Sequence, residues 1–119
     1  MARNMSFMLT TEQIKSRSKT VTRRLGWSFL KPGTIVNACE KCMGLKRGEK
    51  ISKLRQIRIV GVRAESLNEM SKDPKYGKDE AIREGFPDMS GPQFVAMFSE
   101  HMKCDMGQVV NRIEFEYLD

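Results

Sequence analysis

Residues 18–27, SKTVTRRLGW, bring together an amine, two threonine hydroxyls, two guanidinium groups and the chain's only tryptophan. A threonine hydroxyl becomes an effective nucleophile when a nearby base takes its proton. A lysine can be that base when burial or neighbouring cations lower its pKa, and Lys19 has Arg23 and Arg24 close by in the sequence. The segment can therefore supply a nucleophile, a base and donors for an anion, although a cationic strand is more often a solvated edge or a phosphate-contacting surface.

The elements that would position these groups follow from local patterns. Val21 between two threonines predicts a strand. On that strand Lys19 and Arg23 would share one face, and Thr22 would point to the other. Further along the chain we expect strands at 34–39, 54–64 and 109–118, and helices at 11–17, 79–86 and 90–103.

Capping and stop signals support the helices. Thr10 and Ser90 are each followed three residues later by a glutamine, the pattern of a capping box at a helix start. Gly85, with a proline two residues beyond it, is a stop signal and places Glu84 on the last turn of its helix. Within the long middle strand, Gly61 indicates a bulge or a close backbone approach, and a bulge would help the sheet to curl.

The order of these motifs resembles a known family. Lys19-Thr20-x-Thr22-x-Arg24, followed by Leu30-Lys31-Pro32-Gly33 and a strand, resembles the signature of the ASCH family, small relatives of the PUA RNA-binding fold. The resemblance continues through a middle strand ending near Val62, the acidic helix Glu80-Ala81-x-x-Glu84-Gly85-Phe86 and a final strand. It implies one α+β domain over residues 1–119, a small, mostly antiparallel PUA-like β-barrel with five or six strands and two or three helices.

The resemblance also implies a catalytic set. In bacterial members that hydrolyse N4-acetylcytidine, a lysine, a threonine and a glutamate do the chemistry, and the matching positions are Lys19, Thr22 and Glu84. Thr22 would attack the amide carbonyl, Lys19 would take and return protons, and Glu84 would direct water to the acyl-enzyme. Arg24 would contact a phosphate or the developing oxyanion. No cofactor is implied for this chemistry.

Charge suggests an alternative that needs no turnover. The chain carries a net +6, but residues 1–78 hold eighteen Lys and Arg against six Asp and Glu, whereas residues 79–119 hold three against nine. A basic region of this kind suits RNA, because each cation that neutralises a phosphate releases a counterion. The candidate contacts for RNA or a modified nucleoside are Arg17, Arg23, Arg24, Trp27, Lys46 and Arg47. Trp27 would stack on a base or pack in the core.

All three cysteines and the single histidine fall into two short pairs, Cys39 with Cys42 and His101 with Cys104. Two thiolates on a turn, with an imidazole and a third thiolate one helical turn apart, predict a structural Cys₃His zinc site. The alternative is three reduced cysteines and a histidine at a helix C-terminus, where its charge suits the helix dipole.

Length and composition set the remaining expectations. A chain of 119 residues with 39% hydrophobic residues is large enough for one core without disulfides. No apolar run approaches the length of a membrane span, and no export signal precedes the first motif. We therefore expect a soluble, cytoplasmic protein without a membrane partner.

Overall fold

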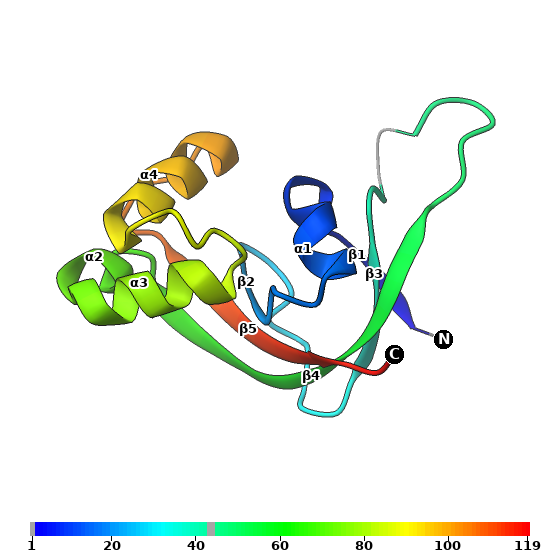
Figure 1. The fold of residues 1–119 in the computed structure, drawn as a ribbon, viewed down its shortest axis with the longest axis horizontal. Helices are drawn as coiled ribbons and strands as arrows, with labels where there is room; N and C mark the ends of the chain where they lie inside the picture. The colour runs from blue at the N-terminus through cyan, green and yellow to red at the C-terminus, as the bar shows by residue number, and fades with distance from the viewer. Residues whose placement is uncertain (1, 43–44) are drawn as a thin grey trace.

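The computed structural model describes residues 2–42 and 45–119 and forms a curled, mixed sheet with helices around it (Figure 1). The five strands lie in the order β1-β3-β4-β5-β2. Their bounds are β1 Arg3–Ser6, β2 Val21–Arg24, β3 Ile35–Cys39, β4 Lys53–Ser66 and β5 Val109–Tyr117. Since β1 and β2 lie at the two ends of this order, the sheet is an open half-barrel, compatible with a small PUA-like fold.

The three pairings among β2 to β5 are antiparallel, as expected, but β1 pairs with β3 in parallel. The register of β4 against β5 shifts between Ile59 and Gly61, which confirms the bulge predicted at the glycine. A bulge increases the local twist of a strand. The long β4 therefore curves along its length in Figure 1 and, with β5, spans the whole molecule.

The structure has four α-helices within the described ranges, of which the first two are very short. The helical elements are the 3₁₀ turn η1 Met8–Thr10, α1 Thr11–Lys15, α2 Glu69–Lys72, α3 Pro74–Arg83 and α4 Gly91–Met102. The capping box at Ser90 is confirmed, with both of its hydrogen bonds present. The one at Thr10 is wrong, because this residue ends η1 and makes no side-chain cap; instead the Thr11 hydroxyl donates to the Phe7 carbonyl, 3.1 Å away.

Two hydrophobic clusters share the sheet. The first lies between α1 and the strands and consists of Met5, Phe7, Ile14, Leu30, Val36, Ala38, Ile57, Ile59, Ile113 and Phe115. The second lies under the later helices and consists of Leu67, Met70, Ala81, Phe94, Val95, Phe98 and Val110. Because β5 contributes to both clusters, it connects two separately packed regions.

Close packing of α3 on α4 depends on Gly77 and Gly91, whose Cα atoms face each other. A Cβ at either glycine would lie 2.0 Å from the Met70 carbonyl oxygen, so neither position admits a side chain without movement of the backbone. This packing fixes the end of α3, where Glu84 lies. Across residues 2–42 and 45–119, no helix combines the length and apolar character needed to cross a membrane.

Candidate active site

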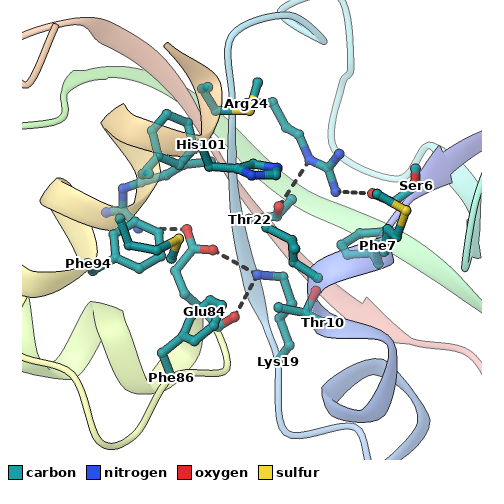
Figure 2. Close-up of a pocket in the computed structure, with 16 residues that line it drawn as sticks. Ser6, Phe7, Thr10, Lys19, Thr22, Arg24, Glu84, Phe86, Phe94 and His101 are labelled. Carbon is teal, nitrogen blue, oxygen red and sulfur yellow. Dashed lines mark hydrogen bonds and ion pairs between the residues drawn. The ribbon is translucent and has the colours of Figure 1, made fainter. Parts of the chain in front are cut away.

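A pocket of about 200 Å³ opens between η1, β2 and α4, and it contains the residues that the sequence singled out for chemistry (Figure 2). Lys19, Thr22, Arg24 and Glu84 line it together, and we call these four residues the polar cluster. Apolar side chains from η1, α4 and the α3–α4 connection form most of the remaining lining. The pocket therefore combines a polar base with largely apolar walls.

Lys19 and Glu84 form the closest pair of the cluster. The Lys19 ammonium donates to the Glu84 carboxylate at 2.7 Å and to its backbone carbonyl at 2.6 Å, and both side chains are 3% exposed. Glu84 follows the last residue of α3, and the next residue, Gly85, has a φ of +100° that suits glycine. The Tyr117 hydroxyl donates to the Lys19 carbonyl, which fixes the backbone just before β2.

Burial lowers the pKa of Lys19 below its ordinary value of 10.5. The Glu84 carboxylate opposes this shift, whereas Arg24 and Arg23 add to it by repelling the charged ammonium. Desolvation is the largest of these effects. A lysine with a lowered pKa is the kind of base that a threonine nucleophile requires.

Thr22 and Arg24 form the second half of the polar cluster. The Arg24 Nε donates to the Thr22 hydroxyl oxygen at 3.1 Å, and its terminal nitrogen donates to the Ser6 carbonyl at 2.6 Å. Its guanidinium also lies 4.7 Å from the centre of the Phe7 ring. Burial lowers the pKa of Arg24 to about 10. Among the described residues no carboxylate lies within ion-pair distance of this side chain, so it is a cation without an acidic partner in the pocket.

Arg23, the neighbouring arginine, points into a buried ion-pair network instead. It donates to Glu80 at 2.7 Å, to Glu84 at 3.1 Å and to Glu65 at 3.5 Å, and its side chain has no exposed surface. Arg112 donates to both oxygens of Glu80. The glutamates enclose the charged end of Arg23, although the residue also contributes to the pocket lining, and its contact with nucleic acid stays a prediction.

Hydrogen bonds from Arg112 and Arg23 lower the pKa of Glu80 to about 2, against the opposing effect of its burial. Arg23 keeps one nitrogen, Nε, without a hydrogen-bond partner within the described part of the chain. The network otherwise satisfies its polar atoms, as buried charges require. Its location directly beneath Glu84 gives that carboxylate a fixed position.

The remaining residues predicted to bind nucleic acid lie outside the pocket. Arg17 is exposed and donates to the backbone carbonyl of Asp119. Trp27 is half-buried and packs against the first hydrophobic cluster, beside the Phe29 ring. Lys46 and Arg47 are exposed on the connection between β3 and β4, of which residues 43 and 44 fall outside the described residues. Of the predicted contacts, Arg24 is the one that brings a charge without an acidic partner to the described pocket.

The structure does not assemble the predicted zinc ligands. Cys39, Cys42, His101 and Cys104 all belong to the described residues, among which no group of three or more His, Cys, Asp or Glu side chains is placed to hold a metal ion. Cys39 is buried at the end of β3, where burial raises the pKa of its thiol to about 11. His101, at the end of α4, instead lines the pocket.

Sequence reasoning did not predict that η1 and α4 form two walls of the pocket. Residues 8–10, which form η1, carry no chemical motif, and only the tertiary structure places them across from α4. Phe94, Phe98 and Met102 are spaced four residues apart, which is typical of the core-facing stripe of a helix, and the first two are buried. Met102 is 40% exposed at the pocket, so the end of the stripe leaves the core.

No family model and no curated protein matches this chain. Two solved structures are similar to it. The crystal structure of the hypothetical protein PH0355 has a TM-score of 0.65 and 21% identity, over 99% of this chain and 100% of that one. The ASCH domain from Lactobacillus crispatus JV V101 has a TM-score of 0.61 and 14% identity, over 97% of this chain and 78% of that one. At these identities the likeness concerns the fold, and it confirms the expected ASCH-type architecture.

Proposed function

We propose that the pocket hydrolyses the amide of an N4-acylated cytidine or a similar modified nucleoside. The observation that carries this proposal is the meeting of Lys19, Thr22, Arg24 and Glu84 in one pocket, although Lys19 and Glu84 are 65 residues apart in the sequence. A nucleophile, a base, an anion-binding donor and a carboxylate within hydrogen-bond reach of the base are the parts that acyl transfer needs.

Thr22 is the nucleophile and Lys19 is its base. A neutral amine has two hydrogens and one lone pair, and Lys19 already donates to two oxygens of Glu84. Once the Lys19 ammonium has lost a proton, these two bonds occupy both hydrogens of the neutral form, and the lone pair is left to accept the Thr22 proton. The resulting ammonium then gives a proton to the departing N4 nitrogen, so that cytidine leaves as a neutral amine.

Arg24 stabilises the negative charge that develops on the carbonyl oxygen. It has no carboxylate partner in the described structure, and its Nε already points at the hydroxyl oxygen of Thr22. A donor fixed beside the nucleophile before the reaction is worth most in a site that excludes water. Glu84 then accepts a proton from the water that attacks the acyl-threonine ester and passes it to the departing Thr22 oxygen, which releases the carboxylic acid and restores both Thr22 and Glu84.

The test is release of cytidine from N4-acetylcytidine and N4-butanoylcytidine, followed by chromatography. Thr22→Val removes the hydroxyl at nearly constant shape and should lower turnover at least about 10³-fold. Thr22→Ser keeps a hydroxyl and should retain part of the activity. Equal release by the valine variant would exclude Thr22 as the nucleophile, and no release from either compound by folded wild-type protein would overturn the proposed function.

A non-catalytic RNA-binding role is the second candidate, and one observation favours it. Lys46 and Arg47 are exposed on a basic connection that belongs to neither hydrophobic cluster. Exposed cations on such a connection suit a phosphate backbone. Binding through them would not involve the pocket, so it would survive Thr22→Val unchanged.

A further inference from the structure

We propose that the acyl group hydrolysed in this pocket is longer than acetyl, an apolar chain of about four carbons. This inference rests on the proposed function and specifies which substrates of that class fit. It follows from the apolar character of one wall, from the location of the other polar groups and from the size of the pocket.

The wall formed by α4 and the α3–α4 connection is aromatic and apolar. Phe94 is in contact with both neighbouring rings, with centroids 5.9 Å from Phe86 and 6.0 Å from Phe98. Met97 lies on the same helix and also lines the pocket. At the opening, Met8 on η1 and Met102 on α4 are 56% and 40% exposed. A surface of this composition gains free energy by covering apolar groups.

The orientation of the substrate follows from where polar partners exist. Figure 2 draws Phe86 and Phe94 on the same side of Lys19 as Glu84, whereas Ser6 and Thr10 lie on the other side. A cytosine ring packed against Phe86, Phe94 and Met97 would find no donor on these side chains for its ring nitrogen and carbonyl oxygen, which is costly. The imidazole of His101 is the polar group that α4 adds to the lining. An acyl chain has no polar atoms beyond its carbonyl. The chain therefore lies against the aromatic wall, and the base lies toward the hydroxyls and the opening.

Size sets the expected length of the chain. The pocket volume is about 200 Å³, below the roughly 300–1,000 Å³ of pockets that enclose drug-sized ligands, so only a short chain can be enclosed. An acetyl group ends one carbon beyond the amide carbonyl and would leave much of the aromatic wall uncovered. A chain of about four carbons would reach further along that wall, and a longer one would extend toward the opening.

The experiment measures the Kd of N4-acetyl-, N4-butanoyl- and N4-hexanoylcytidine for the Thr22→Val protein by titration calorimetry, so that no turnover interferes. Each methylene buried should tighten binding about fourfold, so butanoyl should bind about fifteenfold more tightly than acetyl. Hexanoyl should gain less per methylene, because its end reaches the opening. An acetyl compound that binds as tightly as the butanoyl one, or no saturable binding by any of the three, would overturn the inference.

A pair of methionine variants locates the chain. Met97→Gln, added to Thr22→Val, keeps the side-chain length but makes this wall polar, and should reduce the butanoyl preference to below about fivefold. Met106→Gln is the matched control, since Met106 is 54% exposed and does not line the pocket, and it should keep the full preference. An unchanged preference in the Met97 variant would show that the chain lies elsewhere and would overturn the inference.

The two proposals can fail separately. If wild-type protein releases cytidine from the acetyl compound at least as efficiently as from the butanoyl one, and binding shows no chain-length dependence, hydrolysis stands and the chain-length inference falls. If affinity rises with chain length but wild-type protein releases cytidine from none of the three, the apolar subsite stands and the proposed function falls.

Discussion

Arg23 and Arg24 are neighbours on the same strand, yet the structure places their charges in opposite surroundings. Arg23 donates to three glutamates beneath the pocket, whereas Arg24 lies in the pocket beside a hydroxyl, a backbone carbonyl and an aromatic ring. Alternation along β2 sends successive side chains in different directions. Both residues contribute to the pocket lining, but a single step in sequence separates a guanidinium paired with carboxylates from one that has no such pair among the described residues. The comparison shows that residue type alone does not tell which of the two arginines is paired with carboxylates.

The difference follows from charge balance in the two regions. In the buried network Lys19, Arg23 and Arg112 face the carboxylates of Glu65, Glu80 and Glu84, so that each cation has an acidic partner. Within residues 2–42 and 45–119, Arg24 has no such partner and leaves a positive charge in the pocket. Paired charge holds α3 against the sheet, and the charge of Arg24 remains available for a ligand.

The largest expected effect comes from breaking the paired side. Arg23→Met removes one cation while Glu80 and Glu84 stay buried, and should lower the free energy of unfolding by about 3–5 kcal/mol. In Arg24→Met every buried carboxylate of the described structure keeps its basic partner. The free energy of unfolding should therefore change by about 1 kcal/mol or less. Urea unfolding of both variants measures the difference. Equal destabilisation by the two variants would show that pairing with carboxylates does not make Arg23 more important for stability than Arg24.

The second-largest effect is expected from acid, which should lower the stability that the buried ion-pair network provides. Hydrogen bonds from Arg112 and Arg23 lower the pKa of Glu80 to about 2, below its ordinary 4.5. A lowered carboxyl pKa contributes stability that is complete above pH 4.5 and is lost as the pH falls through 2. The loss should be about 3 kcal/mol.

Glu80→Gln tests this assignment, because the amide cannot titrate. The variant should be less stable than wild type at pH 7 and should lose less of its stability between pH 5 and pH 2. Unfolding measured at several pH values gives both results. A variant with the same acid sensitivity as wild type would assign that sensitivity to other carboxylates.

Activity should respond to the arginine in the pocket. Arg24→Met removes the donor to the developing oxyanion and should lower kcat about a hundredfold, while the protein stays folded. Arg24→Lys keeps the charge but loses the planar group that contacts both Thr22 and the Ser6 carbonyl, so it should restore only part of the rate. Wild-type turnover by Arg24→Met would remove this arginine from the proposed mechanism.

The contrast between the two arginines also marks the limit of sequence reasoning. Strand β3, the capping box at Ser90 and the bulge at Gly61 depend on local residue preferences and were predicted. Strand β1, residues 3–6, was missed because its formation depends on parallel pairing with β3 rather than on a local pattern. The burial of Arg23 was missed for the same reason, since its acidic partners come from β4 and the end of α3.

The predicted catalytic set, Lys19, Thr22 and Glu84, lies between these two cases. Local patterns placed Glu84 at a helix end and Lys19 beside a strand, but only the family resemblance connected them to one another. The structure brings the two side chains into contact, so the geometry agrees with the resemblance. Neither pattern nor resemblance indicated the apolar walls, because the motifs at Thr10 and His101 predicted a helix cap and a zinc ligand rather than the lining of a pocket.

The smallest effect is expected at the exposed cations, which form a third class beside the two kinds of buried arginine. Changing Lys46 and Arg47 together to alanine should leave stability and amide hydrolysis unaltered, because both side chains lie on the exposed connection, away from the pocket and the buried network. If this connection binds single-stranded RNA, the double variant should make the slope of log K against log salt concentration shallower by about 1.4, or about 0.7 for each phosphate that is no longer neutralised. Binding of a labelled oligonucleotide at several salt concentrations measures this slope. An unchanged slope would exclude the connection as an RNA-binding surface, and a decrease in hydrolysis by the same variant would show that the exposed and buried cations are not independent.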